Sequence, residues 1–253
     1  MEEEAPILPA LLHTCGNAIT RADRYCPACG GRITDDKEVI HENIFTSRSM
    51  LIVLGYYCIC FGVWLVIEYG DWVQDAHDFY VLHIVDAAIT LTFALIGIKQ
   101  LIPLYSFKNV VLKKVLLYSL AAVIGSIAIN YITTLINISL FDSDLRFYPL
   151  FSSSEYPVAY MIALIAVYPA LFEEMAFRGF MFNSVKNLAG GTNAVIVTSL
   201  LFAIVHFAFL SLFWLIPFAL ITARLRNKYN TLWYGMAIHF AFNLTACIIE
   251  IIN

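Results

Sequence analysis

Long uncharged apolar runs, separated by short clusters of charged or turn-forming residues, dominate the chain after residue 48. Each run is close to the roughly 20 residues that an α-helix needs to cross the hydrocarbon core of a membrane. The pattern predicts an all-α polytopic bundle of about seven transmembrane helices. The expected spans are residues 50–69, 79–103, 114–140, 157–183, 193–210, 212–223 and 231–252. The sixth run is short and contains Pro217, so a broken or partly inserted helix is expected there.

The composition agrees with a membrane protein and divides the chain into two parts. Hydrophobic residues make up 60% of the 253 positions and charged residues 13%, whereas soluble domains are about half apolar and about a quarter charged. Residues 1–48 hold 5 of the 15 Lys and Arg residues and 8 of the 19 Asp and Glu residues. We therefore expect a polar segment at 1–48 and a transmembrane domain at 49–253. The formal net charge of −4 offers no basic face and excludes general nucleic-acid binding.

The distribution of Lys and Arg predicts the orientation in the membrane, because cytoplasmic connections carry an excess of these residues. The second and last predicted connections are basic, with Lys108, Lys113, Lys114, Arg224, Arg226 and Lys228. The first and third are acidic, with Asp71, Asp75, Asp78, Asp142, Asp144 and Glu155. We expect an integral protein of the plasma membrane whose residues 1–48 are cytoplasmic.

The polar segment contains a degenerate zinc-ribbon-like motif. Cys26-Pro27-Ala28-Cys29 places two thiolates at the spacing of a zinc knuckle, and His13 and Cys15 lie upstream. A complete ribbon would have Cys in place of Leu12, so a structural zinc would need Cys15, Cys26 and Cys29 together with His13. The alternative is a former ribbon whose thiols stay reduced in the cytoplasm. The segment is also a candidate surface for a protein partner.

Ionisable residues inside a membrane span are expensive and are candidates for function. The fourth span contains Glu173, Glu174 and Arg178. Glu174 and Arg178 are one helical turn apart and are expected to form an ion pair that offsets the cost of their burial. Glu173 points about 100° away and remains available as a general acid or base. Pro169 cannot donate to the carbonyl of Ile165, so a kink that admits water is expected beside Glu173.

Two later spans add His206, four residues after Phe202, and His239, four residues before Asn243. Residues four apart share a helical face, so Phe202 can line a pocket that contains His206, and His239 and Asn243 can present donors together. From the helical rise, the three clusters that contain Glu173, His206 and His239 lie at similar depths. The sequence therefore predicts a shared aqueous cavity within the membrane.

Asp86 and His83 are further ionisable residues inside a predicted span. With the span boundaries given above, Asp86 lies nearer the outer face of the membrane than the other groups. It therefore fits the shared cavity less well. It is expected to pair with His83 or with a neighbouring helix.

At these residues the chain resembles the CPBP family of intramembrane proteases, also called the Abi family, which includes CAAX prenyl endopeptidases and bacteriocin-processing enzymes. The family pattern is Glu-Glu-x-x-x-Arg, then Phe-x-x-x-His, then His-x-x-x-Asn or Asp. The chain supplies all three parts in order, as Glu173-Glu174 with Arg178, Phe202 with His206, and His239 with Asn243. The resemblance covers about residues 155–250 and marks that range as the protease core.

The resemblance implies an intramembrane endopeptidase for membrane-associated protein or peptide substrates. It implies that Glu173 and His206 hold and deprotonate the attacking water and that His239 and Asn243 donate to the developing oxyanion. Glu174, Arg178 and Phe202 would shape the site. A catalytic metal remains an alternative, because Glu173, His206 and His239 could form a two-His, one-carboxylate zinc site. The chain has no His-Glu-x-x-His motif, and direct activation of water by Glu173 and His206 is favoured.

Two other classes of function are compatible with the sequence. A non-proteolytic membrane scaffold or immunity-type protein of the same fold would act through residues 1–48 and would not need Glu173. A transporter would relay protons through the intramembrane groups, and internal repeats would be typical of it. The sequence shows no such repeat. The partners expected for the favoured function are membrane lipid and a membrane-associated substrate.

Overall fold

The computed structural model describes residues 11–12, 18–19, 48–70, 73, 75–142 and 146–252. The chain forms two compact units, Met1–Ser47 and Arg48–Asn253. In the first unit, β1 (Leu11–Leu12) and β2 (Ala18–Ile19) pair as an antiparallel two-stranded sheet. The residues proposed as zinc ligands, His13, Cys15, Cys26 and Cys29, lie outside the described residues.

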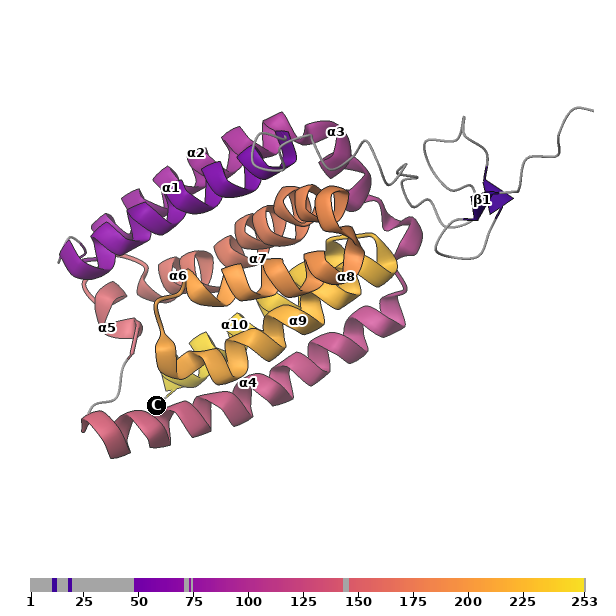
Figure 1. Cartoon of the computed structure of the whole chain (residues 1–253). Helices are drawn as coiled ribbons and strands as arrows, with labels where there is room; N and C mark the ends of the chain where they lie inside the picture. Colours follow the sequence, from indigo (N-terminus) through magenta and orange to yellow (C-terminus); the bar gives the residue numbers. More distant parts are fainter. Residues whose placement is uncertain are drawn as a thin grey trace, which may run out of the picture. The chain divides into compact units, whose positions relative to one another are not determined.

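The described part of the second unit is all-α (Figure 1). Its long helices are α1 (Arg48–Gly70), α2 (Ala76–Ile96), α4 (Leu112–Phe141), α8 (Met181–Ile204), α9 (Leu212–Tyr229) and α10 (Trp233–Ile252). Short helices and 3₁₀ turns connect them: α3 (Ile98–Leu101), η3 (Ile102–Tyr105), η4 (Phe107–Asn109), α5 (Tyr148–Phe151) and η7 (Phe209–Ser211). A continuous helical stretch leads into α8 through α6 (Pro157–Met161), the π-helix η5 (Ile162–Val167), α7 (Tyr168–Glu173) and the π-helix η6 (Glu174–Phe180).

The described helices identify a polytopic membrane protein. Five stretches are long and apolar enough to cross a membrane, namely Ala76–Ile96, Leu112–Leu140, Pro157–Ile204, Phe209–Tyr229 and Trp233–Ile252. A shorter apolar helix covers Ser49–Leu65 in α1. Five stretches of the described residues therefore qualify, where seven separate spans were expected. The fourth and fifth expected spans fall in the one stretch Pro157–Ile204, and the first expected span falls in α1, a helix of 23 residues.

The joined stretch Pro157–Ile204 reverses its direction at Gly190. A straight helix of its 48 residues would be about 72 Å long, more than twice the roughly 30 Å hydrocarbon core. Gly190 has φ 84° and ψ 170°, a conformation that glycine adopts readily and other residues rarely do. After this turn α8 packs back on the preceding segment, because the rings of Phe177 and Phe202 lie 5.3 Å apart.

The sixth expected span is not broken, and the prediction of an interrupted helix is wrong. The helix α9 is continuous over 18 residues with Pro217 inside it. Pro217 lies in the second turn, where its missing N–H affects only the carbonyl of Phe213 at the start of the helix. Arg226 and Lys228, which we expected in a connection, lie on the last turn of α9.

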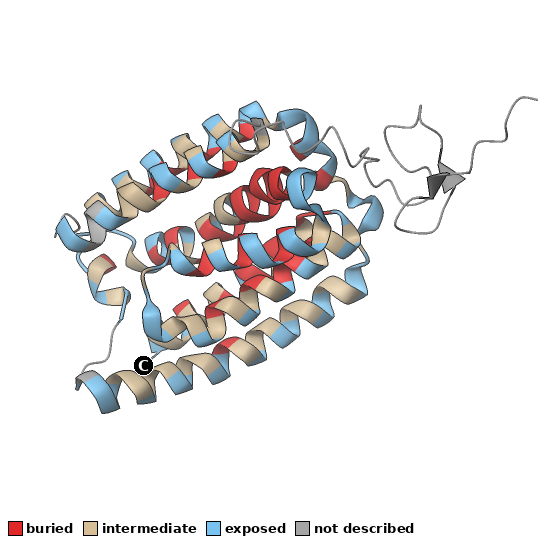
Figure 2. Cartoon of the chain, viewed as in Figure 1, coloured by how far each residue is buried: buried red, intermediate tan, exposed pale blue. Residues whose placement is uncertain are grey.

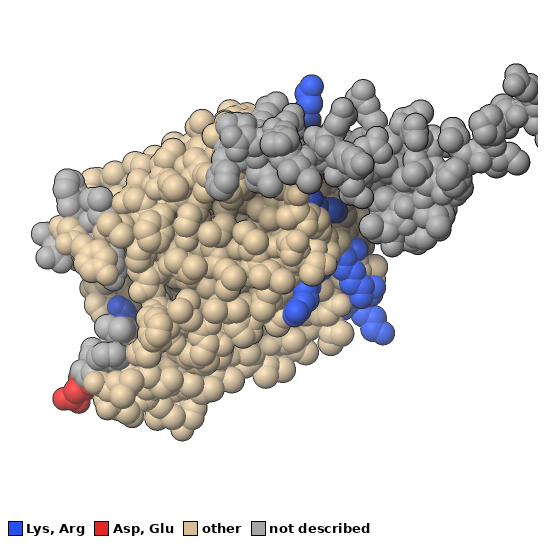
Figure 3. Space-filling model, in the orientation of Figure 1, with Lys and Arg blue, Asp and Glu red and all other residues tan. Residues whose placement is uncertain are grey.

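Burial and charge are arranged as in a bundle solvated by lipid. Buried positions concentrate in η6 and on the facing sides of α8, α9 and α10 (Figure 2). Only 6% of the apolar window of α4 is buried, and α4 packs mainly on α10. On the face shown in Figure 3, most of the visible Lys and Arg side chains gather at one end of this unit, while the visible acidic side chain and one further basic side chain lie at the other. The helix α4 connects the two ends, because Lys113 and Lys114 lie in its first turn and Asp142 caps its end.

Candidate active site

The buried pair of Glu174 and Arg178 organises the centre of the bundle. Both side chains lie on η6 and are almost completely inaccessible, at 0% and 1% exposure. Arg178 Nη1 lies 3.4 Å from Glu174 Oε1, and the ion pair predicted from their spacing is therefore confirmed. In such a buried pair each charge compensates the other, and an isolated charge at this place would be strongly unfavourable.

Contacts from two other helices fix the guanidinium group of Arg178. Its Nε and Nη2 donate to Thr222 Oγ1 on α9, at 3.1 and 2.7 Å. Its Cζ lies 4.2 Å from the centre of the Phe202 ring on α8, a cation–π contact. Arg178 thereby ties η6 to α8 and α9 and holds Glu174 at one place in the core.

His239 lies between the two carboxylates of the motif. On α10, its Nδ1 is 3.2 Å from Glu174 Oε1 and its Nε2 is 3.9 Å from Glu173 Oε2. In the Nδ1–H tautomer, His239 donates to Glu174 and leaves Nε2 as an acceptor. In the doubly protonated form, both ring nitrogens donate. Glu174 therefore orients this imidazole, and Glu173 lies beside its second nitrogen.

The two adjacent carboxylates occupy different environments, as expected from their helical positions. The Glu173 side chain is 27% exposed, whereas that of Glu174 is fully buried. The Oε2 atom of Glu173 is itself buried and has no hydrogen-bond partner among the described residues. Glu173 is therefore the carboxylate whose side chain is partly accessible, and its buried Oε2 is an acceptor that no described residue uses.

His206 joins the cluster through the ring of Phe202 rather than through a described contact with Glu173. It follows the end of α8, is exposed, and its Nδ1 lies 2.7 Å from the carbonyl oxygen of Phe202. This bond makes Nδ1 the protonated nitrogen of the neutral ring and leaves Nε2 available. The Phe202 ring lies 4.6 Å from the His206 ring and 5.9 Å from the His239 ring. Phe202 therefore contacts both imidazoles as well as Arg178.

Asn243 makes a backbone contact that the sequence did not indicate. Its Nδ2 donates to the carbonyl oxygen of Ile165 at 2.8 Å. Pro169, four residues after Ile165, has no N–H to donate to that carbonyl. The helix does not end at Pro169, and the π-helix η5 precedes it. Asn243 thus connects α10 to the irregular helix just before Glu173.

Asp86 belongs to a separate buried cluster. We expected it to pair with His83 or with a neighbouring helix, and the structure shows contacts with neighbouring helices. It accepts hydrogen bonds from Tyr168 Oη at 2.6 Å and from Cys60 Sγ at 3.6 Å. His83 instead bonds through Nδ1 to the carbonyl of Phe79. Because Tyr168 begins α7, Asp86 connects α2 to the helix that ends at Glu173.

Two further residues at the site were not identified from the sequence. Thr222 accepts from Arg178, and Gly235 faces Glu174 so closely that an added Cβ would collide with Glu174 Oε2. The five N–H donors of an arginine exceed what one carboxylate can accept, so the sequence does indicate that further acceptors exist. It does not indicate which of the later helices supplies them.

The described residues do not form the three-ligand metal site considered as an alternative. Among them, the group of three side chains whose ligand atoms lie within 4.8 Å of one another is Asp75, His77 and Asp78. Asp75 there caps the start of α2 by accepting from the backbone N–H groups of His77 and Asp78. Glu173, His206 and His239 are not among the groups gathered in this way within the described residues.

The fold and the site define a polytopic membrane protein with a carboxylate and imidazole cluster buried between its helices. Residues 155–245 match the model of the family described as type II CAAX prenyl endopeptidase Rce1-like. The chain therefore carries a domain of this family, which is part of the CPBP or Abi group. No curated protein and no solved structure matched the chain. The matched domain is that of a family of intramembrane proteases, whose substrates are membrane-associated.

Proposed function

We propose that this protein is an endopeptidase that hydrolyses peptide bonds of membrane-associated proteins or peptides, with Glu173 and His206 activating the water. The main support is the position of Glu173 Oε2, which has no hydrogen-bond partner among the described residues. This atom lies 3.9 Å from His239 Nε2, and Glu174 holds the same imidazole at Nδ1. Hydrolysis needs a base next to a donor, and this arrangement can supply both.

In the proposed reaction, water lies between Glu173 Oε2 and His206 Nε2. Glu173 takes a proton from the water as its oxygen adds to the carbonyl carbon of the substrate. His239, held at Nδ1 by Glu174, donates from Nε2 to the resulting oxyanion when both of its ring nitrogens carry a proton. Glu173 then returns the proton to the departing nitrogen as the C–N bond breaks. Asn243, which holds the carbonyl of Ile165, is assigned a positioning role.

The proposed location is the plasma membrane, with residues 1–48 in the cytoplasm. The excess of Lys and Arg side chains at one end of the bundle (Figure 3) supports this orientation, because cytoplasmic ends of membrane proteins are rich in Lys and Arg. Substrates would reach the site from the membrane, since Glu173, Glu174 and His239 all lie on stretches long enough to span it.

A comparison of peptide termini in the membrane proteome tests the proposed activity and identifies the substrate. Host cells that lack the protein would carry either the parent or the Glu173→Gln variant, at equal expression. New termini are expected only with the parent, because Gln cannot accept a proton from water. If no terminus differs and the variant still rescues a deletion phenotype, the scaffold function replaces the protease.

Gly235→Ala is expected to lower the rate of hydrolysis about 10²-fold, because a displacement of about 1 Å at a catalytic group has an effect of this size. The added Cβ displaces the Glu174 carboxylate and with it His239. Rates would be measured on a peptide that spans a terminus found in cells. Gly125→Ala on α4 is the matched control, because an added Cβ there meets no atom within 4 Å. Equal rates for the two variants would contradict the role of Glu174.

A further inference from the structure

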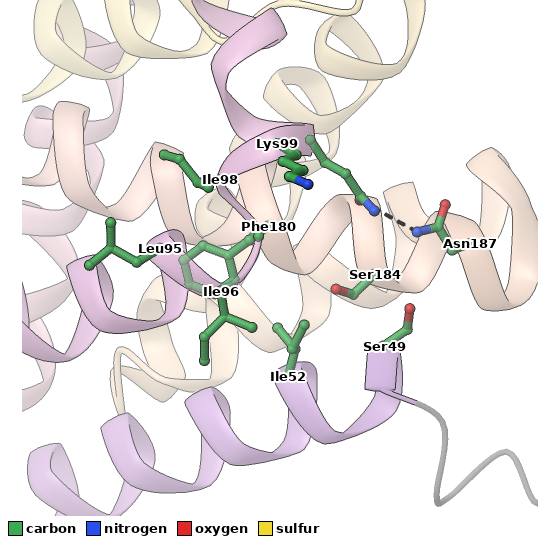
Figure 4. Close-up of a pocket in the computed structure, with 11 residues that line it drawn as sticks. Ser49, Ile52, Leu95, Ile96, Ile98, Lys99, Phe180, Ser184 and Asn187 are labelled. Carbon is green, nitrogen blue, oxygen red and sulfur yellow. Dashed lines mark hydrogen bonds between the residues drawn. The ribbon is translucent and has the colours of Figure 1, made fainter.

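A cavity of about 350 Å³ lies away from the candidate active site, where the start of α1, the end of α2 and α3 meet η6 and α8 (Figure 4). Its polar side chains include Ser49, Lys99, Ser184 and Asn187. Apolar side chains, among them Ile52 and Phe180, form the rest of the wall. The described residues therefore form a chamber that is part polar and part apolar.

The polar part of the cavity is suited to an anion. Lys99 is the charged residue among those that line it, and no acidic side chain is present among these described residues. Ser184 is only 5% exposed, and no hydrogen bond of its hydroxyl is found within the described part of the chain. Figure 4 shows the hydroxyls of Ser184 and Ser49 on the same side of the chamber. A phosphate group accepts hydrogen bonds from hydroxyl and ammonium groups of this kind.

The cavity lies at the end of a membrane span, where lipid headgroups are expected. The membrane span of α2 ends at Ile96, and Lys99 follows within one turn. Leu95 and Ile96 are 68% and 45% exposed, and Leu51 on α1 is 59% exposed. Apolar surface thus continues from the cavity toward the membrane centre, where an acyl chain would lie. Lys99 also marks the cytoplasmic end in the proposed orientation, where anionic lipids concentrate.

We propose that this cavity binds the phosphate headgroup of an anionic phospholipid from the cytoplasmic leaflet, with Lys99 and Ser184 as its main polar contacts. The acyl chains extend along the exposed apolar side chains of α1 and α2. The catalytic role of Glu173 is not required for this binding, so the two proposals can fail separately.

Native mass spectrometry of the purified full chain in neutral detergent tests the site. Phosphatidylglycerol and phosphatidylcholine with identical acyl chains are added at equal concentration, together with a parallel titration of inorganic phosphate. Bound phosphatidylglycerol is expected to exceed phosphatidylcholine about fivefold, the preference that one lysine at a membrane surface provides. Inorganic phosphate is expected not to displace it, because phosphate lacks the apolar contacts.

Variants connect this preference to the cavity. Lys99→Gln is expected to abolish the preference for phosphatidylglycerol, and Ser184→Leu, which fills the chamber, to reduce the binding of both lipids. Lys108→Gln is the matched control, because Lys108 is an exposed lysine outside the cavity. The proposal is overturned if Lys99→Gln keeps the preference, or if Lys108→Gln lowers it equally. Displacement of the lipid by phosphate alone would identify a free anion as the ligand and overturn the lipid assignment.

Discussion

Replacing Glu173 with Gln is expected to lower the rate of peptide hydrolysis about 10²- to 10⁴-fold, the usual contribution of a general base. Gln has nearly the same shape and keeps one oxygen toward His239, but it cannot take a proton from water. The loss should therefore appear in kcat while the fold and the affinity for the peptide change little. Initial rates of the purified full chain, reconstituted in vesicles, on a peptide identified in cells measure this effect.

Glu155→Gln is the control for this experiment. Glu155 is an exposed carboxylate that precedes the helical stretch of the site, so the same chemical change there should leave the rate unaltered. Hydrolysis by Glu173→Gln at the rate of the parent would show that another group activates the water. Loss of activity in both variants would instead indicate a general effect of removing a charge.

Replacing Arg178 with Met is expected to destabilise the fold by about 3–5 kcal/mol, the typical result of leaving one partner of a buried ion pair alone. The carboxylate of Glu174, fully buried, would lose its compensating charge. Thr222 Oγ1 would lose two donors. The free energy of unfolding in mixed micelles, obtained from denaturant titration of helical circular dichroism, measures the change.

Two further variants show whether this loss comes from the uncompensated charge. Arg224→Met on the same helix as Thr222 removes an exposed arginine and is expected to have little effect on stability. The double variant with Glu174→Gln removes both charges and should recover part of the stability lost in Arg178→Met. If the double variant is less stable than Arg178→Met alone, the ion pair does not explain the role of Arg178.

Local patterns were sufficient to predict part of the site. The spacing of Glu174 and Arg178 on one helical face predicted their ion pair, because residues four apart meet within a helix regardless of the rest of the fold. The same geometry separated Glu173 from Glu174 and correctly indicated that only one of them is fully buried. Apolar run length predicted where helices occur.

Contacts between helices that are distant in the sequence could not be predicted from local patterns. Helical rise predicted that His239 lies at the depth of Glu173, but not that it lies between the two carboxylates. The donation of Asn243 to the carbonyl of Ile165 depends on how α10 packs against η5, which periodicity does not encode. The expected spans 157–183 and 193–210 belong to one helical stretch in the structure, because a run of apolar residues does not show how the chain continues into the next run. The turn at Gly190 depends on one backbone conformation.

The position of the Gly190 turn between η6 and the end of α8 lets part of the site assemble early during synthesis. Glu173, Glu174, Arg178 and Phe202 belong to one helical hairpin, closed by the contact of Phe177 with Phe202, and can come together as soon as that hairpin has left the ribosome. His239 arrives with α10, after α9. Because synthesis proceeds from the N-terminus, a nascent chain carries Glu173 and Arg178 before His239 is available. In the proposed function, the site is therefore complete only once the last described helix is inserted.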